Sequence, residues 1–228
     1  MHFLLYCVAL LALLPLDKDA KEPFFCERPG AVMRYERRFA DNNKLKWTQE
    51  MSILDVSETE QGKRVSYKSE FRGKSGKLMY GGPVSLEMLV FPNGDIGMDL
   101  SASLKSVASN YVSDSMIKGE PCFSVLPSSM KEGDLLEDAV FEVTVAGLPC
   151  KVSVTDRKVV GRERITVPAG TFDCVVVLEH KSQRLGKLVV SYAYTWYAAG
   201  IGMIRHDTYV KGSLKTTERL VSLTMPEL

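Results

Sequence analysis

Histidine is scarce in this sequence, and the spacings in which proteins usually arrange metal ligands are missing. The chain of 228 residues has three histidines, His2, His180 and His206, and contains neither a Cys-x-x-Cys nor a His-Glu-x-x-His motif. A zinc site needs three or four such ligands close together. His206 is followed by Asp207, but adjacent residues of a strand point to opposite faces of a sheet. We therefore expect no metal ion and no other cofactor.

An excess of charge of one sign is also absent. The chain has 29 Lys and Arg against 28 Asp and Glu, a formal net charge of +1. Proteins that bind nucleic acid usually carry a basic patch or stripe, so we expect no nucleic-acid partner. The hydrophobic share of 45% and the charged share of 25% are ordinary globular values. A chain of this length suits a single domain.

The common motifs of nucleophilic catalysis and of nucleotide binding are missing as well. No Gly-x-Ser-x-Gly turn, which presents a nucleophilic serine in many hydrolases, occurs in the sequence. Gly200-Ile201-Gly202 lacks the third glycine of a dinucleotide fingerprint, and a strand pattern rather than a helix follows it. We predict no catalytic residues and expect that the protein is not an enzyme.

The one long hydrophobic run lies at the N-terminus. Residues 3–16 are apolar apart from Tyr6, and the run is shorter than the roughly 20 residues of a transmembrane helix. It is typical of the apolar part of a secretory signal peptide. We expect residues 1–20 to be a signal peptide and 21–228 to form a single domain without a stable membrane span. A retained anchor is the alternative, because Lys18 would occupy a cleavage position that favours small residues.

Four cysteines remain after such a cleavage: Cys26, Cys122, Cys150 and Cys174. An even number in an oxidising compartment suits one or two disulfides. Four cysteines allow three pairings, and the sequence does not choose between them. The alternative is that all four are small buried hydrophobic residues.

Apolar side chains recur at every second position through most of the chain after residue 30. The positions between them are rich in Lys, Arg, Glu, Ser and Thr. This period of two predicts strands with one apolar and one wet face, which is typical of antiparallel sheets. The alternating sets are Leu45, Trp47, Met51 and Ile53; Val65, Tyr67 and Phe71; Leu86, Met88 and Val90; Phe141, Val143 and Val145; Val152 and Val154; and Leu188, Val190, Tyr192, Tyr194 and Trp196.

Turn signals separate these runs at short intervals. The stretch FPNGDI, residues 91–96, places Pro-Asn-Gly between two strand-like segments, which is a strong hairpin signal. In VPAGTF, Pro168 fixes φ and Gly170 permits a positive φ, so we predict a tight turn there. Further hairpins are expected at residues 183–188 and 210–214.

A separate glycine pair lies in the stretch TWYAAGIGMIR, residues 195–205. Gly200 and Gly202 could hold the backbone close to a ligand, or they could let the sheet bend. Glycine inside a strand pattern usually marks a bulge or a sharp bend. We therefore predict that Gly200 and Gly202 form a corner that curves the sheet.

Residues 101–117 break the alternation. Leu104, Val107, Ala108 and Tyr111 have helical spacing there, which predicts a short helix. About ten strands then have one apolar face to cover, and a sheet of that size twists and curls. The predicted fold is mainly β, with one helix: a strongly curved antiparallel half-barrel of about ten strands around the helix. A closed barrel or a two-sheet sandwich is the alternative.

Several motifs also resemble those of a known family. The stretch VPAGTFDC (167–174), followed by TWYAAGIGMIR (195–205), is similar to a signature of exported bacterial proteins with a domain of unknown function related to the TapB family. GDLL (133–136) and PGAVMRYERRF (29–39) resemble further segments of those proteins. They are grouped with LolA/LolB/LppX-like half-barrels, which carry lipids and lipoproteins across the periplasm. The resemblance implies a LolA-like half-barrel and a periplasmic or secreted location, and it implies no catalytic residues.

Aromatic and methionine side chains of the alternating sets are the candidate ligand-binding residues. Each aromatic ring can bury about 150–250 Å². If these side chains fill the concave face of the sheet they are core; if the helix leaves part of that face open they line a groove for an apolar ligand. The candidate set is Trp47, Tyr67, Phe71, Met88, Tyr192, Tyr194 and Trp196.

Two functions are compatible with the predicted fold and location. The first is a non-enzymatic envelope protein that binds a lipid, an acyl chain or a lipidated partner in the concave face. The second is a scaffold with a packed interior whose partner is another envelope protein. A continuous apolar cavity on the order of several hundred Å³ is expected for the first and a solid interior for the second.

Overall fold

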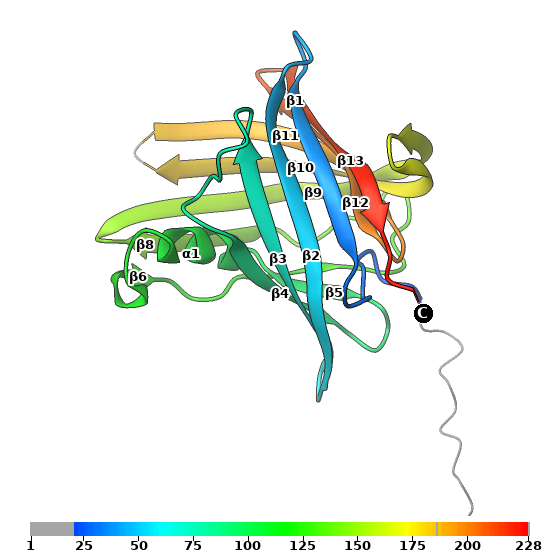
Figure 1. Ribbon diagram of the computed structural model, residues 1–228, viewed down its shortest axis with the longest axis horizontal. Helices are drawn as coiled ribbons and strands as arrows, with labels where there is room; N and C mark the ends of the chain where they lie inside the picture. Colours follow the sequence, from blue (N-terminus) through cyan, green and yellow to red (C-terminus); the bar gives the residue numbers. More distant parts are fainter. Residues whose placement is uncertain (1–20, 186, 228) are drawn as a thin grey trace, which may run out of the picture.

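The computed structural model describes residues 21–185 and 187–227, so the predicted signal peptide lies outside the described residues. One large antiparallel sheet of 13 strands dominates the fold (Figure 1). The alternation in the sequence predicts about ten strands. Three of the 13, β5, β6 and β7, have four residues or fewer and are too short to show an alternating pattern. No helix among the described residues is long and apolar enough to cross a membrane.

The strands follow one another along the sheet mostly as they do along the chain, in the order β6-β8-β9-β10-β11-β12-β13-β1-β2-β3-β4-β5-β7. Their bounds are β1 Val32–Phe39, β2 Leu45–Thr59, β3 Gly62–Gly73, β4 Val84–Val90, β5 Ile96–Asp99, β6 Ile117–Lys118, β7 Phe123–Leu126, β8 Ala139–Val145, β9 Leu148–Val167, β10 Gly170–Leu185, β11 Lys187–Ala198, β12 Gly202–Val210 and β13 Ser213–Thr224.

The sheet is not closed into a barrel. Its two ends are β6 and β7, and the chain passes from one end to the other through residues 119–122. In Figure 1 the strands β1 to β3 run steeply, and β9 to β11 run across them. Such a change of direction follows from strand twist that accumulates over a large sheet. The chain therefore forms neither the closed barrel nor the two-sheet sandwich that the sequence left as alternatives.

The predicted helix is present but short. The helix α1 covers Ala102–Ser109 and a 3₁₀ turn covers Asp114–Met116. The helix lies beside β4, β6 and β8 (Figure 1). Its C-terminal end is tied to the loop before β4, because the Asn110 side-chain amide donates hydrogen bonds to the carbonyl oxygens of Tyr80 and Pro83, at 2.8 and 3.3 Å. These bonds fix the helix over one face of the sheet.

That face, which we call the inner face, carries the buried apolar residues of the first strands. On β1 it is occupied by Met33 and Tyr35, on β2 by Ile53 and on β3 by Val65, all at most 2% exposed. A second cluster, formed by β8 and β9, packs against Leu104 of α1. Burying a large apolar side chain contributes about 1.5–3 kcal/mol, so these clusters supply much of the driving force for folding.

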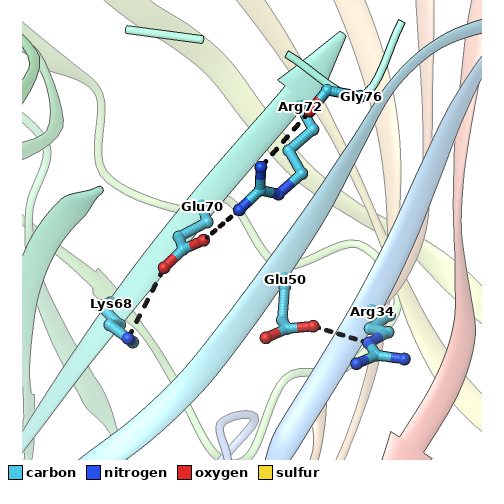
Figure 2. A network of polar contacts seen from close by, with 6 residues as sticks. All are labelled: Arg34, Glu50, Lys68, Glu70, Arg72 and Gly76. Carbon is cyan, nitrogen blue, oxygen red and sulfur yellow. Dashed lines mark hydrogen bonds and ion pairs between the residues drawn. The ribbon is translucent and has the colours of Figure 1, made fainter. Parts of the chain in front are cut away.

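The opposite face of β1 to β3, which we call the outer face, is charged (Figure 2). Arg34 on β1 pairs with Glu50 on β2 at 2.7 Å. Glu70 on β3 lies between Arg72 at 3.1 Å and Lys68 at 3.7 Å. These pairs are partly or fully exposed, and such pairs contribute about 1 kcal/mol or less each. Their main consequence is to keep this face of the sheet in water.

The four described cysteines form no disulfide. Cys26, Cys150 and Cys174 are buried, and Cys122 is partly buried. Burial is the main reason that the pKa of the Cys174 thiol is raised to about 12. A thiol of such a pKa stays protonated, so Cys174 behaves as a small apolar residue, the alternative left open by the sequence.

Candidate functional site

A hollow of about 520 Å³ opens on the inner face of the sheet. It is lined from one side by β1 to β4 and β13, from the other by β8 to β10, and from above by α1. We call it the inner hollow. Because strands from both halves of the sheet line it, its shape depends on the curvature of the whole fold. Its volume lies within the range of roughly 300–1,000 Å³ that is usual for small-molecule sites.

Aromatic side chains form the apolar side of the inner hollow. Trp47 on β2 and Phe71 on β3 meet edge to face with ring centres 5.3 Å apart, and Phe71 meets Tyr80 in the same way at 5.2 Å. Edge-to-face contacts of this kind add about 0.5–1.5 kcal/mol beyond the buried area. The two strands bring these rings together because Trp47 and Phe71 both occupy inner-face positions of adjacent strands. Each ring is therefore held in place while one side faces the hollow.

The helix and the second half of the sheet complete the apolar lining. Leu104 and Val107 are one turn apart on α1, and both line the hollow. Facing them are Phe141 of β8 and Val152 of β9, which belong to the second core cluster. These four side chains are aliphatic or aromatic, which suits an acyl chain.

One wall of the inner hollow is polar. Arg37 on β1 donates hydrogen bonds through Nε to the Thr216 hydroxyl, at 3.0 Å, and through Nη2 to the Thr208 hydroxyl. Its Nη1 atom lies 3.9 Å from Oε2 of Glu218, too far for a hydrogen bond. The guanidinium carbon also lies 5.4 Å from the centre of the Trp47 ring. The polar wall thus adjoins the aromatic side.

Glu218 is the unusual member of this wall. Its side chain is 6% exposed, and its Oε1 atom is buried with no hydrogen-bond partner among the described residues. Burial raises the pKa of this carboxyl to about 7, although the Arg37 charge opposes the shift. A buried polar atom without a partner normally costs about 1–3 kcal/mol, so its presence beside a hollow is a mark of a site.

His206 lies opposite Glu218 in the register of β12 and β13 and stays uncharged. Its Nδ1 atom is 2.8 Å from the Thr195 hydroxyl. Burial, with smaller contributions from Arg37 and Lys181, lowers the pKa of His206 to about 3. Of the side chains that line the hollow, Arg37 and Lys181 therefore carry positive charge, and Glu218 is the acid.

The structure separates the seven predicted binding residues into two groups. Trp47, Tyr67 and Phe71 line the inner hollow. Met88 is opposite Val65 on the inner face but is 5% exposed and packed in the core beside the hollow. The other three residues are Tyr192, Tyr194 and Trp196.

These three lie on the outer face, not on the predicted concave one. Lys181 and Gln183 of β10 line the hollow, so His180, next to Lys181 in the strand, points to the outer face. Tyr192 of β11 lies opposite His180 in the sheet and therefore shares that face. On the outer face Tyr192 stacks on Tyr209 with ring centres 4.8 Å apart. Alternation shows which residues share a face, but the register of the sheet decides which face is covered.

Trp196 closes this outer row. Its Nε1 atom donates to a carboxylate oxygen of Glu163 at 2.7 Å, and the Arg205 guanidinium carbon lies 4.7 Å from its ring centre. Arg205 in turn pairs with the buried Asp207 at 2.6 Å. Every polar group named here has a partner within the chain, as expected of a structural cluster.

Arg37, Glu218 and Tyr80 were missed in the sequence analysis. Arg37 lies on the inner face. It shares the parity of Met33 and Tyr35, and that shared parity with buried residues was the available signal. Glu218 shares the parity of the buried Leu220 in the same way. A charged residue that alternates in step with the buried residues of its strand therefore indicates a candidate site.

The predicted turn residues lie in hairpins. Pro168 is the first residue of the two-residue turn between β9 and β10, and Gly170 follows it with φ of 144°. Gly200, with φ of 70°, lies in the tight turn between β11 and β12, and Gly202, with φ of 108°, is the first residue of β12. The Gly200 amide donates to the Pro23 carbonyl at 2.7 Å. The hairpin that contains Gly200 is thus tied to the N-terminal segment.

A larger hollow, of about 900 Å³, lies along β3 to β5 and the end of β2. Its lining includes Glu60, Arg64 and Glu87, which are exposed, and the exposed apolar residues Leu54 and Phe123. Strands from one half of the sheet and Ala102 of α1 form it, and no charged side chain of its lining is buried. We therefore regard the inner hollow as the candidate site.

The sequence of the chain can now be placed among known families, since residues 29–220 match the DUF3108-like family. The chain belongs to the DUF3108-like family. The matched segment extends from before β1 to within β13 and includes the whole lining of the inner hollow, from Arg37 to Glu218. None of the curated proteins compared with the chain matches it. Family membership therefore places the hollow within the shared region without assigning it a task.

Two solved structures share the fold of this DUF3108-like chain. A candidate lipoprotein of Parabacteroides distasonis ATCC 8503 is 20% identical, with a TM-score of 0.73 over 90% of this chain and 99% of its own. A candidate exported protein with a YmcC-like fold, from Bacteroides fragilis NCTC 9343, is 21% identical, with a TM-score of 0.70 over 89% and 99%. These matches show a common fold. They give no link to TapB-related or LolA-like proteins, so that part of the resemblance stays a prediction.

Proposed function

We propose that the chain is a non-enzymatic protein of the cell envelope that binds an apolar ligand in the inner hollow. The ligand is a lipid, an acyl chain, or the lipid part of a lipidated partner protein. The observation that carries the proposal is the hollow itself: about 520 Å³, with Trp47, Phe71, Tyr80, Leu104 and Phe141 in its lining. In this proposal the curved sheet acts as a half-barrel and α1 as its cover.

An exported location supports the same proposal. The apolar run of residues 3–16 predicts export. The two proteins of similar fold are named as a candidate lipoprotein and a candidate exported protein. A protein in the envelope is surrounded by lipids and lipidated proteins, which are the ligands that an apolar hollow of this size can take.

The proposal is tested by native mass spectrometry of the chain purified from its own envelope, because a bound lipid adds a discrete mass. Val107→Trp fills the hollow from α1 with an indole ring. Val140→Trp is the matched control, since Val140 precedes the inner-face Phe141 on β8 and is 55% exposed. We expect the added mass in the parent and in Val140→Trp and its loss in Val107→Trp.

The alternative function, a scaffold that binds another envelope protein without a small ligand, makes the opposite prediction. All three proteins then give the bare mass, and added apolar ligands do not bind to any of them. Equal added mass in all three would also contradict the proposal, because the ligand would then lie outside the inner hollow.

A further inference from the structure

The inner hollow is chemically divided, and the division bears on what kind of molecule it holds. One end is mainly apolar, with Phe71, Leu104, Phe141 and the ring of Tyr80. The other end is the polar wall around Arg37. A simple hydrocarbon would leave that wall unused, and a fully polar ligand would leave the apolar end unused. The lining fits an amphiphile, which has both kinds of surface.

The polar wall offers hydrogen-bonding groups that the chain does not use. Among the hydrogen bonds of the described residues, Arg37 uses Nε and Nη2, and its Nη1 atom makes none. Oε1 of Glu218 is buried and without a partner among those residues. The Nη1 atom and the Glu218 carboxyl are 3.9 Å apart at their nearest atoms, so one head group can reach both.

The charge of the wall favours an anion. Arg37 and Lys181 bring two positive charges to the lining. His206 is neutral, because burial lowers its pKa to about 3. Burial raises the pKa of Glu218 to about 7, and a nearby anion would raise it further, so the carboxyl can donate a proton in a hydrogen bond to an acidic head.

We propose that the ligand is an anionic amphiphile whose carboxylate or phosphate head accepts hydrogen bonds from Arg37 and Glu218, with its chain along the aromatic side of the hollow. This inference rests on the proposed function. Arg37 is suited to the task because its Nη1 donor is directed by the two threonine hydroxyls that hold its other nitrogens. The Trp47 ring, 5.4 Å from the guanidinium carbon, marks where head and chain meet.

The test compares four probes with the same twelve-carbon chain: dodecanoate, dodecyl phosphate, dodecanol and dodecylamine. Binding to the delipidated full chain is measured by isothermal titration. A charge-assisted hydrogen bond contributes about 1.5–3 kcal/mol, so we expect at least one of the acids to bind about tenfold or more tightly than dodecanol. The amine should bind most weakly. A preference for one acid over the other identifies the head group.

Arg37→Gln should remove this preference, so that acids and alcohol bind alike while the dissociation constant of dodecanol changes less than about threefold. Arg34→Gln is the matched control, because Arg34 lies on the same strand but on the outer face, paired with Glu50. Lys181→Gln, at an exposed side chain of the lining, should reduce the preference about threefold and serves if Arg37→Gln does not fold.

The outcomes separate the two proposals. If none of the four probes binds, the proposed function fails and this inference fails with it. If acids and alcohol bind equally to the parent, or if Arg37→Gln and Lys181→Gln both keep the full preference, the inference is wrong while the apolar binding function stands.

Discussion

Two rows of aromatic side chains lie on opposite faces of the same sheet and are used differently. The inner row, Trp47 and Phe71 with Tyr80 beside them, lines the inner hollow. The outer row, Tyr192 and Tyr209 among others, packs on itself. Both rows are aromatic, so the presence of rings does not by itself distinguish a binding face from a structural one. The space that opposing elements leave in front of the rings distinguishes them.

The buried acids of the two faces differ in the same way. On the outer face Asp207 is 1% exposed, and both of its oxygens accept from Arg205, at 3.0 and 2.6 Å. On the inner face Glu218 is 3.9 Å from Arg37 and has an unpartnered oxygen. The sheet thus pairs one buried acid completely and leaves the other incompletely paired where the hollow lies.

The largest effect is expected for the outer tryptophan, Trp196, and concerns stability rather than ligand binding. Trp196→Ala should lower the free energy of unfolding by about 3–5 kcal/mol, because it removes a buried ring that also bonds to Glu163. Urea unfolding measures the loss. The dissociation constant of a twelve-carbon acid should not change, and Trp196→Phe should restore most of the stability. A large loss of ligand affinity in the still-folded variant would place the outer row in the site.

The second prediction concerns pH. The pKa of Glu218 is raised from 4.5 to about 7, so the folded state binds its proton more tightly and this group's contribution to stability falls as pH rises through that interval. Glu218→Gln removes this loss. Between about pH 4.5 and about pH 8, the free energy of unfolding of the variant should rise by roughly 3 kcal/mol relative to that of the parent. Urea unfolding at several pH values measures this difference. A difference that stays constant with pH would contradict the account.

His206 should change the stability with pH in the opposite direction, so it serves as an internal control. Its pKa is lowered from 6.5 to about 3, so its contribution to stability is present above pH 6.5 and is lost as pH falls toward 3. His206→Gln should therefore make the acid side of the profile flatter, whereas Glu218→Gln should make it steeper between about pH 5 and 6.5. The same direction of change in both variants would show that other groups dominate the profile.

Much of the fold could be predicted because alternation is a local property of the chain. The long strands, the Pro-Asn-Gly hairpin before β5 and the helix near Leu104 all carry local signals. The number of strands could not be predicted, since β6 has only two residues and pairs with β8, far along the chain. Its position depends on long-range packing and leaves no pattern in the sequence.

The site could be predicted only in part. Trp47, Tyr67 and Phe71 follow from their shared parity on adjacent strands. The face of Tyr192, Tyr194 and Trp196 does not follow, because an apolar row on one strand is equally compatible with either side of a curved sheet. Glu218 could be suspected from its phase with Leu220, but its lack of a partner depends on distances that only the folded chain sets.

The third prediction concerns Gly200, in the turn between β11 and β12. Gly200 has φ of 70°, and a β-branched side chain is strained in that region. Gly200→Val should cost about 1–3 kcal/mol of stability, measured by thermal or urea unfolding. Gly200→Asn should cost less, because asparagine tolerates a positive φ. A valine variant as stable as the parent would show that this conformation is not required.

The smallest effect is expected for the outer tyrosine stack. Tyr209→Ala removes a partly buried ring that stacks on Tyr192, with an expected loss of about 1 kcal/mol. Tyr80→Ala is the inner counterpart and should weaken the binding of twelve-carbon probes severalfold. If Tyr209→Ala weakened the binding of these probes and Tyr80→Ala did not, the assignment of the two faces would be reversed.

The most direct test uses the fact that the chain has two tryptophans, one in each row. Trp196→Phe leaves the inner Trp47 as the only indole, and Trp47→Phe leaves the outer Trp196. A fatty acid with bromine on its chain quenches indole fluorescence on contact. The account predicts saturable quenching of Trp47 in the first variant and none of Trp196 in the second. Quenching of Trp196 alone, or of neither tryptophan at concentrations that saturate the protein, would contradict it.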